Sequence, residues 1–290
     1  MHQWRTRPAL RLPDRAREAL ATQTAAEPIR VDDVIARFRP EEHIDRANAY
    51  FVREHEEDQL YRRPFANLDE VQPRIAGLGY VLQQLELFPG AKVLDFGCGT
   101  GWLSRVVATL GLEVIGTDVS ENALRLAREF IARDPLADRF KIDFRYFDSI
   151  HLPLEDASVD RIVSFDAFHH VFDQEGTLRE MARVLRPGGI VAFHEPGPHH
   201  SLTPTAQSEM RNYDVIENDI DLRRIWGFAE KLGFENIWIS LPAIHSPMIG
   251  LDQLDRVAAG KPSHDDVERI VQNVHNFIYN LRIFSLHKAR

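Results

Sequence analysis

Cysteine is almost absent, because Cys98 is the only one in the chain of 290 residues. No disulfide can therefore form within the chain, as is usual in reducing compartments. The first 17 residues carry arginines but lack the apolar core of a secretory signal. No apolar run approaches the roughly 20 residues that a transmembrane helix needs. These absences lead us to expect a cytoplasmic protein with no membrane span.

Clustered basic charge is lacking as well. The chain has 35 Lys and Arg against 44 Asp and Glu, which gives a formal net charge of −9. Nucleic acids attract proteins that present patches of Lys and Arg, whereas the basic residues here are mostly interleaved with acids. We therefore expect no nucleic-acid partner. The hydrophobic share of 44% is ordinary for a globular chain that buries a large core.

Strand and helix patterns alternate after residue 90. Short apolar runs are typical of buried parallel strands, and segments of helical spacing separate them. We predict strands at 91–96, 112–117, 141–147, 159–165, 189–194, 235–241 and 280–287. We predict helices at 102–110, 121–133 with Ser120 as N-cap, 176–185 and 222–232. This alternation predicts a doubly wound α/β fold with a mostly parallel seven-stranded sheet.

The other segments divide the chain further. Residues 1–30 mix Arg, Pro and Ala, and we expect a poorly ordered or loosely docked terminus there. Residues 31–89 have helical spacing punctuated by Pro64, Pro73 and Pro89, which predicts a helical extension or lid before the domain at 90–290. Aromatic residues near the N-terminus either form that lid or, more simply, pack as helical core: Trp4, Tyr50, Phe51, Tyr61 and Phe65. A mostly helical insertion at 242–279 either covers a substrate pocket or only packs.

Glycines gather directly after the first predicted strand, in Asp95-Phe96-Gly97-Cys98-Gly99-Thr100-Gly101. Glycine lets the backbone turn tightly and approach a ligand, and ligands of open α/β sheets bind at the carboxyl ends of strands. The third glycine comes one place early for a dinucleotide fingerprint, and no lysine follows as a phosphate-binding loop would need. Asp95 would repel a pyrophosphate, but it could orient the loop or pair with a ligand cation.

A second acid, Asp118, ends the next predicted strand, one βαβ unit after the loop. A carboxylate at this place in adenosine-binding sites accepts hydrogen bonds from the ribose hydroxyls. Its two oxygens suit a vicinal diol. The loop and this acid together favour an adenosyl ligand that has no phosphate.

Five segments, in order, resemble the motifs of class I S-adenosylmethionine (SAM) dependent methyltransferases. They are VLDFGCGTG at 93–101, VIGTDVSENALRLA at 114–127, Phe147-Asp148 with 152–160, FDAFHHV at 165–171 and VLRPGG at 184–189. The resemblance covers about a third of the chain. It implies a Rossmann-like fold, SAM as cofactor and methyl transfer as the activity.

The resemblance also implies which residues hold the cofactor. The glycines would line its methionine and ribose parts, and Asp118 would hold the ribose hydroxyls. Asp148 would accept from the adenine amino group, with Phe147 and Ser149 beside the ring. Phe165 and Asp166 would lie near the methyl donor. The full set for cofactor binding is Asp95, Gly97, Cys98, Gly99, Gly101, Asp118, Val119, Phe147, Asp148, Ser149, Phe165 and Asp166.

Methyl transfer mainly requires alignment of donor and acceptor. An oxygen acceptor of high pKa also needs a general base, and histidine is the commonest. We predict His169, His170 and His199 as catalytic candidates, with local packing as the alternative for each. His194, Glu195 and His200 are also close in sequence, but no helical spacing fixes a metal geometry. We therefore expect no metal site.

Two sequence motifs that the chain lacks narrow the class of methyl acceptor. Methyltransferases that act on DNA or on glutamine amides carry an Asn/Asp-Pro-Pro-Tyr/Phe motif after the fourth strand, where this chain has Asp166-Ala167-Phe168-His169. A Cys-rich zinc motif is also missing. We expect methyl transfer to an O or N atom of a small molecule, such as a sugar, a glycolipid precursor or a natural-product intermediate. A non-catalytic SAM-binding scaffold and an aminopropyl transferase stay open as alternatives, as do a monomer and a homodimer.

Overall fold

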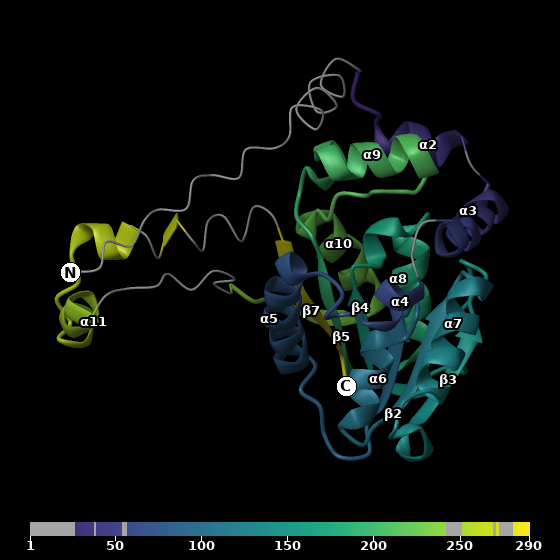
Figure 1. Cartoon of the computed structure of the whole chain (residues 1–290), viewed down its shortest axis with the longest axis horizontal. Coiled ribbons are helices and arrows are strands. Elements are labelled where there is room, and N and C mark those ends of the chain that lie inside the picture. Colours follow the sequence, from purple (N-terminus) through teal and green to yellow (C-terminus); the bar gives the residue numbers. More distant parts are fainter. Residues whose placement is uncertain (1–26, 38, 54–56, 242–250, 269–270, 273–280) are drawn as a thin grey trace.

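A seven-stranded sheet forms the centre of the computed structural model, which describes residues 27–290 except 38, 54–56, 242–250, 269–270 and 273–280 (Figure 1). Its strand order is β3-β2-β1-β4-β5-β7-β6. The strands are β1 (Lys92–Phe96), β2 (Glu113–Asp118), β3 (Lys141–Tyr146), β4 (Val159–Phe165), β5 (Leu185–Pro196), β6 (Phe234–Ile239) and β7 (Leu281–Lys288). Strands β1 to β5 pair in parallel, and β7 runs antiparallel to both of its neighbours. The predicted mostly parallel, doubly wound α/β sheet is confirmed.

Helices flank this sheet (Figure 1). The α-helices are α2 (Val31–Arg37), α3 (Pro40–Arg53), α4 (Glu57–Tyr61), α5 (Leu68–Gln84), α6 (Trp102–Thr109), α7 (Glu121–Ala132), α8 (Gln174–Val184), α9 (Pro204–Tyr213), α10 (Leu222–Ala229) and α11 (Leu251–Ala258). Short 3₁₀ turns are η1 (Ala137–Arg139), η2 (Phe168–His170), η3 (His200–Leu202) and η4 (Glu230–Leu232). Among the described residues, none of these helices has the length and apolar character that crossing a bilayer requires.

Two hydrophobic clusters occupy the two faces of the sheet. Successive residues of a strand point to opposite faces. Leu94 of β1 therefore packs in the cluster that contains residues of α8 and α10. Its neighbour Val93 packs in the cluster that contains residues of α5 and α6. Burying one such side chain contributes about 1.5–3 kcal/mol, so the two clusters fix the sheet and with it the ends of its strands.

The turn predicted before the fifth strand lies inside β5. Leu185 already pairs with Val159, and the pairing then resumes at Ile190 opposite Arg161, so a bulge accommodates the Pro-Gly-Gly residues. Gly188 has a φ of +73°, which favours glycine. The preceding helix, predicted at 176–185, is α8 at Gln174–Val184. The N-cap prediction for α7 is confirmed, because the Ser120 side chain accepts a hydrogen bond from Ala123 N.

The extension before β1 is helical, with boundaries that differ from the prediction. Asn67 caps α5 by accepting from Asp69 N, and the helix continues through Pro73, one of the prolines that punctuate the predicted helical extension. Most of the predicted terminus at 1–30 lies outside the described residues, as does Trp4. Much of the predicted insertion at 242–279 also lies outside them, and its described part includes α11.

The segment between β5 and α10, for which the sequence predicted no element, contains η3 and α9. Thr203 caps α9 by accepting from Ala206 N, and Pro204 occupies the first turn. Figure 1 shows α9 beside α2. Gln207 joins the two segments, because its side chain exchanges hydrogen bonds of 2.8 and 2.9 Å with the backbone of Ile29. Of these two helices, α9 contributes to the lining of the cavity described next.

Candidate functional site

A cavity of about 600 Å³ opens at the carboxyl ends of β1, β2 and β4. Pockets for small ligands have volumes of about 300–1,000 Å³. One side of the cavity is made by loops that follow the strands. The other side is made by α3, by residues near α4 and α5, and by the segment from η3 to Glu217. The loops after the strands hold most of the predicted cofactor residues.

The glycines after β1 differ in what surrounds them. Gly97 and Gly99 line the cavity and have φ values of +67° and +52°. A Cβ on Gly97 would lie 2.4 Å from the Cβ of Ala167. A Cβ on Gly101 would instead meet the ring of Phe144 at 2.8 Å. Gly101 is not among the lining residues, so it permits close packing of α6 against β3 rather than contact with a ligand. Cys98 and Thr100 line the cavity with the first two glycines.

The two predicted acids, Asp95 and Asp118, lie in different surroundings. Asp95 is buried outside the cavity lining and accepts a hydrogen bond of 2.6 Å from the hydroxyl of Ser104, which ties β1 to α6. Burial raises the pKa of Asp95 to about 7. Asp118 lines the cavity. Its two oxygens accept 2.8 Å hydrogen bonds from Gly99 N and Ser120 N. Burial also raises the pKa of Asp118, and these two amides oppose the rise.

The loop after β3 contributes Phe147 and Ser149 to the lining, but not Asp148. Asp148 Oδ1 accepts hydrogen bonds from Ile150 N at 2.8 Å and His151 N at 2.6 Å. Burial opposes but does not outweigh these two bonds, which lower the pKa of Asp148. The structure therefore separates Asp148 from its two neighbours, although the sequence grouped the three. The Asp148 carboxylate is thus hydrogen-bonded to backbone amides of its own turn.

The loop after β4 brings Phe165 and Asp166 to the cavity. Asp166 Oδ1 lies 2.9 Å from His194 Nδ1, and Oδ2 lies 3.5 Å from a guanidinium nitrogen of Arg74. Although burial alone would raise it, the pKa of Asp166 is held well below its usual range by His194 and Arg74. The His194 ring stacks on Phe165 with centroids 3.8 Å apart. His194 thus positions the aromatic and acidic residues expected near the methyl donor.

His169 is oriented by a fully buried carboxylate, Glu195. The Glu195 side chain accepts hydrogen bonds of 2.8 Å from the Ser164 hydroxyl and 2.8 Å from Phe168 N. Its second oxygen lies 2.7 Å from His169 Nδ1. A carboxylate in this position fixes the proton on Nδ1, so Nε2 keeps a free electron pair. The cavity lining includes His169, and sequence reasoning gave Glu195 no such role.

Three histidine rings lie around the carboxylate of Glu217, a residue that the sequence analysis did not predict for the site. The carboxylate is buried, and Oε2 lies 2.6 Å from His200 Nε2 and 3.8 Å from His169 Nε2. Oε1 lies 3.6 Å from His170 Nδ1, which also contacts the Ile216 carbonyl at 2.7 Å. All four of these side chains line the cavity. We call His169, His170, His200 and Glu217 the imidazole cluster.

His199, a predicted catalytic candidate, is not among the lining residues. It is exposed, with a φ of +66° directly before η3, and His200 lines the cavity instead. His200 therefore replaces His199 as a candidate catalytic residue. No motif marked the segment that carries Glu217. The only local signal in the sequence was the Thr203-Pro204 helix start, which predicts an element but not a site.

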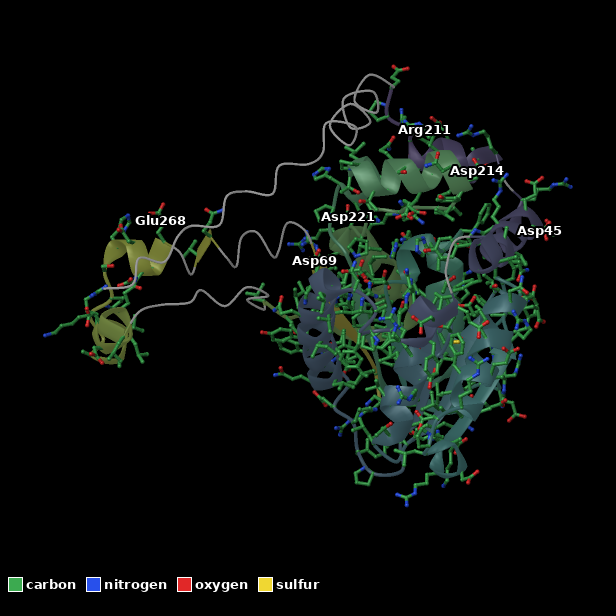
Figure 2. All side chains as sticks on the ribbon, viewed as in Figure 1. Asp45, Asp69, Arg211, Asp214, Asp221 and Glu268 are labelled. Carbon is green, nitrogen blue, oxygen red and sulfur yellow. The ribbon has the colours of Figure 1, made fainter. Side chains whose placement is uncertain are left out.

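The helical extension forms part of the cavity wall. The ring of Phe51 on α3 lies 3.7 Å from the position of a Cβ on Gly99. Asn48 Oδ1 accepts from the Ser120 hydroxyl at 3.1 Å, which holds α3 against the start of α7. An ion pair between Arg46 and Asp214 joins α3 to the end of α9, on the side where Figure 2 labels Asp214. Phe51, one of the aromatic residues considered for a lid, thus lies in the wall of the cavity.

Comparisons with known proteins agree with this geometry. Residues 94–193 match the family described as methyltransferase domain. The methyltransferase GfsG of Streptomyces halstedii is 35% identical over 160 residues, which are 53% of this chain and 56% of that protein. The 27-O-demethylrifamycin SV methyltransferase of Amycolatopsis mediterranei is 36% identical over 121 residues, 41% of this chain and 42% of that one. The chain spans about half the length of these curated relatives.

A solved structure shares the fold. The phosphoethanolamine N-methyltransferase 2 of Haemonchus contortus, in complex with SAM, has a TM-score of 0.58 at 21% identity and covers 84% of this chain and 60% of that chain. The sheet order, the glycine loop after β1 and the match over 94–193 point the same way. On these grounds residues 94–193 form a methyltransferase domain of the class I SAM-dependent type.

Proposed function

We propose that this protein binds SAM in the cavity and transfers its methyl group to an O or N atom of a small molecule. One observation carries the proposal: Asp118 and the backbone of Gly99 line the same space at the carboxyl ends of β1 and β2, joined by a 2.8 Å hydrogen bond. Ligands of doubly wound sheets bind at this edge. The alternative of a non-catalytic SAM-binding scaffold shares the cofactor pocket but requires no acceptor site.

The residues present fit the cofactor. Gly97 and Gly99 leave backbone open to a ligand, and Asp118 has two oxygens for a ribose diol. Among the described residues, the hydroxyls of Thr100 and Ser149 are buried without a hydrogen-bond partner. Buried polar groups are nearly always paired, so a polar ligand in the cavity would satisfy them. Phe147 and Val119 supply apolar surface for the adenine ring. The bound cofactor would supply an electrophilic methyl group on a sulfonium.

Arg63 is our candidate for holding the carboxylate of the cofactor. It is half-buried and lines the cavity, and its guanidinium has no ion-pair or hydrogen-bond partner within the part of the chain that the structure describes. Arg74, in contrast, is paired with Glu70 and Asp166. A guanidinium binds a carboxylate through two parallel hydrogen bonds. SAM has one carboxylate and would place it against such a group.

The acceptor end of the cavity is assigned to the imidazole cluster. An acceptor O–H or N–H held against Nε2 of His169 would lose its proton to that nitrogen as the acceptor attacks the methyl carbon. Bound SAM would supply the methyl group for the new bond to oxygen or nitrogen and would leave as S-adenosylhomocysteine. Glu195 keeps the opposite ring nitrogen protonated and so maintains the base. His169, which lines the cavity and is oriented by Glu195, is thus the preferred base among the predicted histidines.

A natural-product intermediate is the acceptor class that we favour. One relative is named as a methyltransferase of 27-O-demethylrifamycin SV, a compound of that type. The cavity of about 600 Å³ has to hold the cofactor and the reacting part of the acceptor together. This size suits a small molecule, or one end of a larger one, and excludes a bulky group deep inside.

The test combines binding with transfer. Calorimetry should give one site each for SAM and for its demethylated product, S-adenosylhomocysteine. Labelled SAM incubated with the protein and a metabolite extract should then label a small molecule, which mass spectrometry identifies. His169→Gln should retain cofactor affinity and lose most of the transfer. Absence of affinity for both cofactor forms would refute the proposal, and binding without any labelled product would favour the scaffold alternative.

A further inference from the structure

The imidazole cluster has the composition of a metal site. One ring nitrogen each of His169 and His170 and one oxygen of Glu217 lie within 4.8 Å of one another. His200 Nε2 adds a fourth donor 2.6 Å from Glu217. We propose that His169, His170, His200 and Glu217 bind a divalent first-row transition-metal cation such as Zn²⁺ at the acceptor end of the cavity. This proposal differs from the expectation of the sequence analysis, in which the spacing of the histidines indicated no metal site.

The donor set selects the kind of cation. Imidazole nitrogen suits zinc and the neighbouring transition metals, whereas magnesium and calcium prefer oxygen. Zinc binds His nitrogens at about 2.0–2.1 Å and carboxylate oxygens at about 2.0–2.2 Å. The donors of His169, His170 and Glu217 lie within 4.8 Å of one another and need only small side-chain movements to reach one ion. His200 is outside this group and would join it by exchanging its hydrogen bond to Glu217 for the ion. Three imidazoles and one carboxylate are enough for a four-coordinate site, or for three ligands with an open position.

Two of the three histidines, His169 and His170, have the outer contacts that metal-bound histidines usually have, made through Nδ1, which leaves Nε2 of each ring as the ligand atom. Such histidines donate their second ring N–H to a carboxylate or a backbone carbonyl, which fixes the tautomer. His169 Nδ1 contacts Glu195 at 2.7 Å, and His170 Nδ1 contacts the Ile216 carbonyl at 2.7 Å. Glu195 is itself held by the Ser164 hydroxyl and by backbone amides. This outer layer orients the rings before any ion enters.

A cation here would recognise the acceptor through oxygen. A bound cation would occupy Nε2 of His169 and would take over from that nitrogen the activation of the acceptor. A hydroxyl coordinated to a metal gives up its proton to water more readily than a free hydroxyl does. Alcohols and vicinal diols are therefore the ligand class that the site would take. The site shares the cavity with the proposed cofactor but does not depend on it, so the two can be tested separately.

The experiment uses the full-length protein after chelator treatment and buffer exchange. Titration with ZnCl₂ in a calorimeter should give one ion per chain. Co²⁺ should give the visible absorption of a cation bound to imidazole and carboxylate. Glu217→Gln and His200→Gln should each lower the affinity for Zn²⁺ at least about tenfold. Mg²⁺ should bind far more weakly than Zn²⁺, and equal affinities would contradict the donor set.

His151→Gln is the matched control. His151 is an exposed histidine beside a carboxylate, 3.7 Å from Asp148, so it reports chance binding by any such pair. This variant should keep the affinity and stoichiometry of the wild type. Melting temperature and S-adenosylhomocysteine affinity are measured for every variant. If Glu217→Gln does not fold, the partly exposed His200 provides the deciding variant.

Two results would overturn the site: no Zn²⁺ bound by the wild type, or affinity that is unchanged in both cluster variants. Loss of cofactor binding in the wild type would instead refute the proposed function and leave the metal result valid. The two failures are therefore distinguishable.

Discussion

Asp118 and Asp148 both follow strands and both resemble cofactor ligands of the family, but their local contacts differ. Asp118 lines the cavity and joins the glycine loop to the start of α7. Asp148 is half-exposed and accepts from the amides of its own turn. The resemblance assigned both residues to the cofactor. In the structure, Asp118 lines the cavity and Asp148 does not.

Asp118→Ala should weaken binding of S-adenosylhomocysteine by about 1–3 kcal/mol, because charge-assisted hydrogen bonds would be lost. Asp148→Asn should change this affinity by less than about 0.5 kcal/mol, as expected for a surface substitution. Calorimetry at one pH and salt concentration measures both. An equal loss in the two variants would restore the adenine role of Asp148, and unchanged affinity in Asp118→Ala would remove Asp118 from the site.

Arg63→Met tests the carboxylate contact by comparing two ligands. S-adenosylhomocysteine carries the carboxylate, and 5′-methylthioadenosine lacks it. The variant should bind the first about 1–3 kcal/mol more weakly and the second unchanged, because only the first forms a charge-assisted pair with Arg63. Arg125→Met, at a solvent-facing ion pair on α7, serves as the control. Equal losses for both ligands would show that Arg63 acts through the cavity wall instead.

At the scale of elements, α3 and the loops after the strands build the two walls of one cavity. Asn48 links them, because its side-chain oxygen accepts from Ser120 Oγ and its backbone carbonyl accepts from the side chain of Asn122 at 3.2 Å. These contacts lie beside Asp118. The position of α3 and the cofactor contacts are therefore coupled through the N-terminus of α7.

Asn48→Ala should loosen α3 and raise the dissociation rate of S-adenosylhomocysteine several-fold. The association rate should change less, because affinity differences among related complexes mostly reside in dissociation. The free energy of unfolding should fall by about 1 kcal/mol, the contribution of a hydrogen bond. Stopped-flow fluorescence and urea unfolding give the two quantities. A dissociation rate equal to that of the wild type would argue against α3 as a cover of the pocket.

Elements with a strong periodic signal could be predicted, and those positioned by distant contacts could not. The buried strands β1, β2 and β4 were found because apolar runs beside glycine or acid are distinctive. The Pro-Gly-Gly residues looked like a turn, but pairing of Leu185 with Val159 extends β5 through them. Glu217 has no local motif, because it lies in a segment without helix or strand after α9 and is placed by contacts with His169 and His170, which follow β4 far away in the sequence.

At the scale of the whole molecule, one buried acid should affect stability against pH. The pKa of Asp95 is raised from 3.8 to about 7, mainly by burial. Folding therefore favours the protonated form. The stabilising effect is complete below the unfolded-state pKa of 3.8 and is lost as pH rises to about 7.

Asp95→Asn should remove this dependence, because the amide stays neutral and can still accept from Ser104. Between about pH 4 and pH 8, the free energy of unfolding of the wild type should fall relative to the variant by about 2–4 kcal/mol. Urea unfolding at several pH values measures the difference. Parallel curves for the two proteins would show that Asp95 has an ordinary pKa.

The cavity is lined partly by residues of the 94–193 region and partly by residues outside it, and this division has an evolutionary consequence. Its cofactor side comes from the 94–193 region that the family shares, whereas His43, His200 and Glu217 come from outside that region. Mutations can accumulate in the 200–217 segment, and in α3 away from Asn48, without disturbing the proposed contacts to the methyl donor. The specificity for the acceptor can therefore change through mutations in these outer segments, while the region that binds the methyl donor is kept. Related enzymes that methylate different compounds should differ most there.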